Sequence, residues 1–235
     1  MEAGHGQSEV VRLVDNGTVR RLHRALMKSP TYSLFAGVAA SALLALSASA
    51  ADGWQPLFNG KNLDGWKTNE NASTFSVQDG VLVVKGPVSH LFYDGPVNGA
   101  KFTDFELRLE IMTKPGANSG VYIHTAYQAK GFPNKGYEIQ VNNSHTDPKR
   151  GGGVYGIKDN FTAPAKDNEW FTMEIKVVGK RIVTKIDGKE IVDYTEVDNA
   201  KTKKGLGLSS GTIAIQGHDP KSEIHYRKIE IKPLK

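Results

Sequence analysis

The sequence predicts an all-β fold built as a sandwich of antiparallel strands. Nowhere in the 235 residues is an apolar pattern with the 3.6-residue period of an amphipathic helix sustained. Instead, about a dozen short segments alternate apolar and polar side chains, with turn signals roughly every 8–12 residues, as in sandwiches and barrels. The 25 glycines suit a fold with many turns, and the chain length is compatible with one such domain.

The N-terminal part of the chain carries the features of an export signal. Residues 27–50 start at Met27, continue through an apolar run over 34–46 and end on small residues, which predicts a secretory signal peptide. Because such signals start at the initiator methionine, we expect residues 1–26 to be a non-native extension from an over-extended reading frame. A long leader with an arginine pair is the alternative. The expected product is a periplasmic or secreted protein with 51–235 as its folded domain.

The first half of that domain reads as strands and tight turns. A hairpin is expected over 75–85, because Asp79-Gly80 has the composition of a two-residue turn between β-branched and aromatic residues. Strands are expected over 88–93 and over 102–113, the second with clean alternation. The stretch 118–142 follows as two alternating strands joined by a Gly/Pro/Lys loop.

The second half continues in the same way. The segment 148–153, PKRGGG, is expected to be a loop; neither an apolar strand before it nor a helix after it supports a phosphate-binding role. The remaining elements are expected as a short strand over 154–158, a three-stranded meander over 169–178, 181–187 and 189–194, a loop over 193–208, and two closing strands over 212–218 and 222–232.

Polar side chains on three of these strands form the candidate site. A merely solvated face would be rich in Lys, Glu and Thr, whereas these faces carry a carboxylate, amides, imidazoles and a phenol, which suit a hydroxyl-rich ligand. If the strands share one curved sheet, the side chains converge in a groove that can hold a saccharide. The residues are Tyr122 and His124 in the first strand of 118–142, Glu138, Gln140 and Asn142 in the second, and Gln216 and His218 near the C-terminus.

Each of these residues also has a plainer interpretation. A lone glutamate such as Glu138 on a strand face is usually solvated, and a histidine such as His124 is more often structural than catalytic. Arg227 is either a cation of the groove or an outward-facing surface residue. Tyr155 lies beside a loop that we expect at the rim of the groove.

Several functional classes are excluded or unsupported. Without cysteine there are no disulfides, thiolate zinc sites or lipoprotein anchor. The net charge of +5 is scattered and no nucleic-acid-binding motif accompanies it, so no nucleic-acid partner is expected. The chain is expected to meet a membrane only through its signal peptide, and it carries no signal for an oligomeric state. Glu138 has no second carboxylate at strand spacing, so ordinary glycoside hydrolysis by a carboxylate pair is poorly supported.

In order and spacing, segments over most of the domain resemble the 3-keto-disaccharide hydrolase family. The matching pieces are GWQPLFNGKNLDGW, NSGVYIH, GYEIQV, GVYG, the meander from NEWFTMEIKVVG to IDGKEIVDY, and GTIAIQGHDPKSEIHYRKIEIKPL. The resemblance implies a concanavalin-like jelly-roll sandwich, export, and action on glycosides already oxidised at C3. The chain departs from the common pattern at Asp219, where a glycine is most frequent, and at Asn142-Asn143, where an aspartate is frequent.

The resemblance also implies a chemistry that fits the single carboxylate. A ketone at C3 acidifies the proton at C2, so one base and one group that stabilises the enolate suffice for β-elimination of the group at C1. Either Glu138 or His218 is the base, and the other, or Arg227, stabilises the developing charge. The expected contacts to the small saccharide substrate come from Tyr122, His124, Gln140, Asn142, Tyr155 and Gln216.

The cofactor requirement stays open at this point. A divalent metal held by histidine and carboxylate would also serve as the electrophile, whereas no nicotinamide cofactor is needed for this step. A non-catalytic carbohydrate-binding module and a structural domain of the cell envelope are the competing functions, because sandwiches of this shape serve several purposes.

Overall fold

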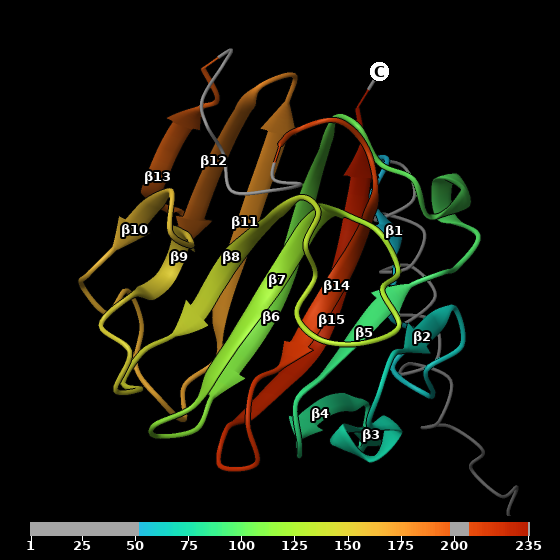
Figure 1. Ribbon diagram of the computed structural model, residues 1–235, viewed down its shortest axis with the longest axis vertical. Helices are drawn as coiled ribbons and strands as arrows, with labels where there is room; N and C mark the ends of the chain where they lie inside the picture. Colours follow the sequence, from blue (N-terminus) through green and yellow to red (C-terminus); the bar gives the residue numbers. More distant parts are fainter. Residues whose placement is uncertain (1–51, 198–206, 235) are drawn as a thin grey trace, which may run out of the picture.

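The structure is a sandwich of two antiparallel sheets. The computed structural model describes residues 52–197 and 207–234, and over these residues one sheet lies behind the other (Figure 1). The predicted all-β sandwich is therefore confirmed. The expected extension, 1–26, and signal peptide, 27–50, lie outside the described residues. No helix among the described residues has the length and hydrophobicity needed to cross a bilayer.

The two sheets contain fifteen strands in the part of the chain that the structure describes. The eight-stranded sheet has the order β13 (Lys189–Thr195), β12 (Arg181–Ile186), β11 (Phe171–Val178), β6 (Phe105–Thr113), β15 (Glu223–Pro233), β4 (Val81–Lys85) and β3 (Phe75–Gln78), with β1 (Gln55–Pro56) paired to β15. The seven-stranded sheet has the order β10 (Lys158–Asn160), β9 (Arg150–Val154), β8 (Tyr137–Asn142), β7 (Asn118–Thr125), β14 (Thr212–Gly217), β5 (Ser89–Tyr93) and β2 (Trp66–Thr68).

The core fills the space between the sheets. In β6 every second side chain is fully buried, because strand side chains alternate between the two faces. The seven-stranded sheet contributes the apolar face that was predicted for 137–142, together with the isoleucines of β14. Each fully buried aliphatic or aromatic side chain contributes about 1.5–3 kcal/mol through removal of its surface from water, so this layer holds the two sheets together.

The other face of the seven-stranded sheet is polar, and strand register decides which residues share it. Tyr122 in β7 lies opposite Glu138 in β8 and opposite Ala214 in β14. Gln216 in β14 lies opposite His90 in β5. Since paired residues of antiparallel strands point to the same side of the sheet, these side chains meet on one surface although they are far apart in the sequence.

One predicted loop is a strand instead. We expected a loop over 148–153 and a strand over 154–158, but β9 runs from Arg150 to Val154, and residues 155–157 form the turn into β10. The glycines of this segment lie close to other parts of the sandwich. A Cβ on Gly152 would lie 3.0 Å from Ile191 in β13, and the hydroxyl of Thr184 donates to the carbonyl of Gly152 at 2.6 Å. The glycines therefore permit close packing of β9, and they do not mark a free loop.

Candidate active site

A groove of about 560 Å³ lies on the polar face of the seven-stranded sheet. Its floor comes from β7, β8 and β14, and its walls come from the connection between β7 and β8 and from the turn after β9. It brings together six of the residues predicted from the sequence. The groove is lined by Asn118, Tyr122, Phe132, Pro133, Tyr137, Glu138, Gln140, Lys149, Tyr155, Gly156, Ile157, Gln216 and His218.

Glu138 is held by two donors at the centre of this groove. The Tyr122 hydroxyl donates to Oε2 at 2.9 Å, and Nε2 of Gln216 donates to Oε1 at 3.0 Å. The same Gln216 nitrogen contacts the Tyr122 hydroxyl at 3.1 Å. Burial raises the pKa of Glu138 to about 7, although both hydrogen bonds and the nearby His218 act in the opposite direction. A carboxyl with this pKa exchanges protons at neutral pH, as a general base or acid must.

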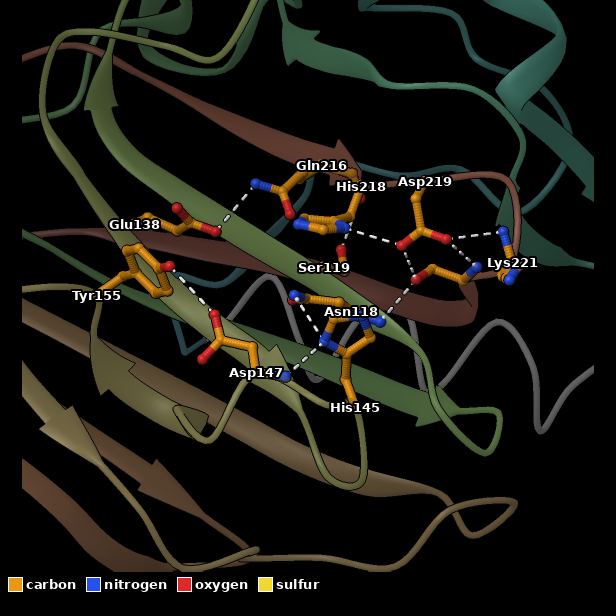
Figure 2. A network of polar contacts seen from close by, with 11 residues as sticks. Asn118, Ser119, Glu138, His145, Asp147, Tyr155, Gln216, His218, Asp219 and Lys221 are labelled. Carbon is orange, nitrogen blue, oxygen red and sulfur yellow. Dashed lines mark hydrogen bonds and ion pairs between the residues drawn. The ribbon is translucent and has the colours of Figure 1, made fainter.

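Gly120 is the residue that lets Glu138 reach Gln216. Glu138 stands on β8 and Gln216 on β14, with β7 between them, and Figure 2 shows their side chains meeting above that strand. A Cβ on Gly120 would lie 2.2 Å from Oε1 of Glu138, far inside van der Waals contact. The missing side chain at position 120 therefore creates the space that the carboxylate occupies.

His218 follows β14 directly and is paired with Asp219. Its Nδ1 lies 2.8 Å from Oδ2 of Asp219, an oxygen that also accepts the Ser222 hydroxyl at 2.6 Å. Partial burial opposes ionisation of Asp219, but the hydrogen bonds from Ser222, His218 and the Lys221 amide outweigh it and lower its pKa to about 2. The ionised carboxylate fixes the ring of His218 and leaves its Nε2 for a ligand, as in other carboxylate–histidine pairs.

The loop after β8 is held by Asn142. Its Nδ2 donates to the carbonyls of Asp147 and Lys149 at 3.0 and 2.7 Å, and its Oδ1 accepts the amide of His145 at 2.8 Å. Asn142 was predicted to contact substrate; instead it is buried under the loop, where these bonds occupy its amide. Tyr155 lines the groove as predicted, and its hydroxyl donates to Asp147 at 3.1 Å (Figure 2).

Two predicted site residues lie elsewhere. His124 was expected beside Tyr122, but a register shift in the pairing of β7 with β14 and a positive φ of 52° at His124 turn its ring inward. There it packs on Phe105, with Nε2 2.7 Å from the Thr103 carbonyl. Arg227, predicted as a catalytic cation, stands on the eight-stranded sheet.

Arg227 forms an ion pair with Glu110 on its own sheet and stacks over Trp170 at 4.4 Å. The cation that does line the groove is Lys149, whose Nζ lies 3.8 Å from the centre of the Tyr155 ring. Side-chain periodicity does not single out Lys149, because it lies in the segment 148–153, for which a loop was expected.

A cluster of metal-binding side chains lies beside His218. His145, His218 and Asp219 offer ligand atoms that all lie within 4.8 Å of one another. However, Nδ1 of His145 accepts the amide of Asp147 at 3.0 Å, and Nδ1 of His218 is paired with Asp219. These three residues are the candidate ligands for a divalent ion. A metal held by histidine and carboxylate therefore stays a prediction.

Three amide oxygens near the groove have no hydrogen-bond partner among the described residues. They are buried atoms of Asn118, Gln140 and Gln216, and all three residues line the groove. Buried carbonyl oxygens usually accept hydrogen bonds, so these three oxygens are acceptors that the described residues leave unused at the floor of the groove. Residue periodicity indicated the two glutamines; only the fold brings Asn118 beside them.

Comparison with known proteins identifies the family of the chain. The profile of a family described as "3-keto-alpha-glucoside-1,2-lyase-like domain" matches residues 53–232. A protein of Bacteroides thetaiotaomicron named 3-keto-disaccharide hydrolase is 24% identical over 172 residues, which are 61% of this chain and 59% of that protein. The aligned part thus spans less than two thirds of the relative.

Solved structures show the same fold. A crystal structure of a candidate glycosyl hydrolase from Parabacteroides distasonis superposes with a TM-score of 0.68 at 20% identity, covering 80% of this chain and 97% of the other. A lichenase from a mouse hindgut metagenome, a member of the concanavalin-like glucanases, gives 0.51 at 11% identity, with 77% and 98% covered. Because the family profile spans nearly the whole described domain, the chain belongs to the 3-keto-alpha-glucoside-1,2-lyase-like family, the family of the 3-keto-disaccharide hydrolases.

Proposed function

We propose that this protein cleaves the glycosidic bond of 3-keto-glycosides, including 3-keto-disaccharides, by β-elimination. The observation that carries the proposal is Glu138, a partly buried carboxyl whose pKa is raised by burial to about 7 and which Tyr122 and Gln216 fix inside a polar groove. Family membership supports this substrate class. The unpartnered amide oxygens of the floor would accept the hydroxyls of the sugar.

In this reaction the carboxylate of Glu138 takes the proton from C2, which the neighbouring ketone makes acidic. The electron pair of the C2–H bond forms a C1=C2 double bond, and the bond from C1 to the glycosidic oxygen breaks. His218, whose Nδ1 is paired with the ionised Asp219, gives a proton from Nε2 to the departing oxygen. Lys149 lines the same groove and would stabilise the enolate oxygen at C3. Water added across the double bond afterwards gives net hydrolysis.

Asp147 favours a second candidate, ordinary glycoside hydrolysis by two carboxylates. It lies close enough to Glu138 to raise the pKa of that carboxyl. Its own oxygens, however, accept the Tyr155 hydroxyl at 3.1 Å and the Lys149 amide at 2.9 Å, which assigns Asp147 to the support of the loop. Elimination needs only one base, and we therefore prefer it.

A matched pair of substrates tests the proposal. The protein is incubated without nicotinamide cofactor with 4-nitrophenyl 3-keto-α-glucoside and with the unoxidised 4-nitrophenyl α-glucoside. Release of nitrophenol from the keto compound alone is the expected result. Release from both would favour the carboxylate pair, and saccharide binding without release from either would favour a carbohydrate-binding module.

The hydrogen isotope found at C2 of the released sugar distinguishes elimination from direct displacement at C1. In D₂O, elimination followed by addition of water places deuterium at C2 of the released sugar, whereas displacement at C1 keeps the original hydrogen. Mass spectrometry during early turnover, with a control for spontaneous exchange of the keto sugar, measures this. An unsaturated product without added water would identify the protein as a lyase.

The site of action is part of the same proposal. The predicted signal peptide, 27–50, would bring the folded domain to the periplasm or the medium. N-terminal sequencing of protein recovered from the periplasm checks this, and an intact leader on that protein would contradict it.

A further inference from the structure

His90 is a buried histidine that lacks hydrogen bonds. It lies in β5 with none of its surface exposed, and neither ring nitrogen has a partner among the described residues. The other fully buried ring, His124, contacts Thr103 and Ser209 through its two nitrogens. Leaving a buried polar group unpaired costs free energy. A bound ligand that forms hydrogen bonds with the two ring nitrogens of His90 would remove this cost.

The register of the sheet aims His90 at the groove. It lies opposite Gln216, whose side chain holds Glu138, so both side chains project from the same polar face. The ring of His90 packs edge-on against Tyr122 at 5.4 Å and against Phe132 at 5.3 Å. Tyr122 and Phe132 both line the groove. His90 therefore lies directly beneath one end of the groove.

The side chain of Phe132 lies against the ring of His90 and covers it. Phe132 belongs to the connection between β7 and β8, which crosses in front of β14 and β5 in Figure 1. The side chain is 49% exposed and also meets the ring of His218 at 6.2 Å. An exposed aromatic ring on a loop can rotate at small cost, because it leaves no cavity in the core, and its face can then pack on the C–H groups of a sugar.

The distance along the sheet indicates which part of a ligand would reach His90. The carboxylate of Glu138 lies above Gly120 in β7, and β14 and β5 are the next two strands. Two strand spacings amount to about 10 Å. One sugar ring above Glu138 does not span that separation, whereas two linked rings do.

We propose that His90 and Phe132 form a second subsite of the groove, which binds the ring that leaves when the glycosidic bond is cleaved. This rests on the proposed function. The subsite then gives a 3-keto-disaccharide a higher affinity than a 3-keto-glycoside with a small aglycone. Phe132 packs on the leaving ring, and the two nitrogens of His90 bind its hydroxyls as one donor and one acceptor.

The protonation state of His90 suits the binding of hydroxyl groups. Burial, with a smaller contribution from His218, lowers the pKa of His90 to about 4, so the ring is neutral at physiological pH. A neutral imidazole offers one N–H donor and one acceptor nitrogen. A sugar hydroxyl can accept a hydrogen bond from the N–H group or donate one to the other nitrogen. A charged ring would offer only donors.

Binding to a protein that cannot turn over tests the subsite. In the Glu138→Gln background, titration calorimetry measures the affinity for methyl 3-keto-α-glucoside and for an α-linked 3-keto-disaccharide. The comparison is then repeated with His90→Phe and with Phe132→Ala added, and with Phe161→Ala as a control, because Phe161 is a 66% exposed aromatic residue outside the groove.

We expect His90→Phe and Phe132→Ala each to weaken binding of the disaccharide about tenfold, the scale of one lost contact. Binding of the methyl glycoside should change less than about twofold, and the control should affect neither ligand. His90→Phe should keep or raise the melting temperature, since it removes two unpaired polar atoms and keeps an aromatic ring at this position.

Equal losses for the two ligands, or no loss in either variant, would overturn the subsite, as would a failure of both saccharides to bind. Failure of the proposed reaction is separate. If the proposed reaction is wrong, the wild-type protein will show no turnover. A loss of affinity for the disaccharide alone in His90→Phe would still establish the subsite.

Discussion

The pKa of Glu138 is set by burial, which raises it, and by neighbouring polar groups, which lower it. Removal from water disfavours its charged form, while Tyr122, Gln216 and His218 favour that form, and the outcome is a pKa of about 7. Exposed on a strand, the same glutamate would be ionised throughout the neutral range. The chemistry at this position is therefore created by its surroundings.

The variants Glu138→Gln and His218→Ala should each reduce kcat at least about a hundredfold, the usual scale for a lost acid–base group. In the wild-type protein, kcat/KM should rise with pH through about 7 as Glu138 becomes ionised. Steady-state rates between pH 5 and 9 measure both effects. Near-normal rates in the two variants would remove these residues from the mechanism.

Glu138 should also make stability depend on pH. Its pKa is higher in the folded protein than in the unfolded chain, so between the ordinary carboxyl value and about 7 the folded state holds a proton that the unfolded state has released. This contribution to stability is present at low pH and is lost as pH rises through about 7. Thermal unfolding of Glu138→Gln should therefore show a gain over wild type that is larger at pH 8 than at pH 5. A gain that is independent of pH would contradict the assigned pKa.

Gly120 should behave as a positioning residue. In Gly120→Ala the new methyl group would lie 2.2 Å from Oε1 of Glu138, so the carboxylate must leave Gln216 and become better solvated. We expect kcat to fall at least about tenfold and the pH profile to shift toward the ordinary carboxyl pKa. Gly151→Ala is the control, because a Cβ there meets nothing closer than 3.4 Å. A normal profile in Gly120→Ala would show that the strand adjusts instead.

At the level of elements, β9 shows how glycines serve close packing. The sheet order places β9 between β8 and β10, and Gly152 has a φ of 81° with Ile191 of β13 beside it. A side chain at this position would be disfavoured both by backbone conformation and by crowding. Because β9 leads from the loop of Lys149 to Tyr155, its packing also positions one wall of the groove.

Two glycine variants separate these effects. Gly188 also has a positive φ, 76°, but a Cβ there would meet nothing within 4 Å. Gly188→Ala should cost about 1 kcal/mol of unfolding free energy through backbone strain alone, and Gly152→Ala about 1–3 kcal/mol more through overpacking. Urea denaturation of both variants measures the difference. Equal losses would mean that crowding at β9 is relieved by small shifts.

For the whole molecule, the two sheets have different roles. The seven-stranded sheet carries the groove, whereas the outer face of the eight-stranded sheet carries ion pairs such as Arg227–Glu110 and Lys176–Glu106. Pairs of this kind contribute little, about 0–1 kcal/mol each, because water screens them. The eight-stranded sheet thus acts mainly as the support on which the curved polar face is held.

Arg227→Ala tests this division directly. Since Arg227 lies on the eight-stranded sheet, the change should leave kcat/KM within about twofold of wild type and lower the unfolding free energy by no more than about 1 kcal/mol. His218→Ala, purified and assayed in the same way, provides the inactive reference. Strong loss of activity in a well-folded Arg227→Ala would return this residue to the catalytic machinery.

Local pattern determined much of this fold. Side-chain alternation and turn residues fixed the hairpin over 75–85, the alternating strand β6, the meander of β11 to β13 and the two closing strands, because these signals depend on neighbours in the chain. They failed where long-range contacts decide. The inward turn of His124 comes from a register shift against β14, and β9 exists because distant residues pack on its glycines.

The class of fold, the polar character of three strand faces and the importance of Glu138 follow from local properties of the chain, namely composition and the period of two. Three-dimensional packing was needed to place β7 between β8 and β14, to show that Gly120 leaves the space for Glu138, and to bring Lys149 and His90 to the site while Arg227 and His124 lie elsewhere. The physical reason is that register and sheet order arise from packing between segments distant in the chain, and burial then sets the chemistry of the side chains brought together.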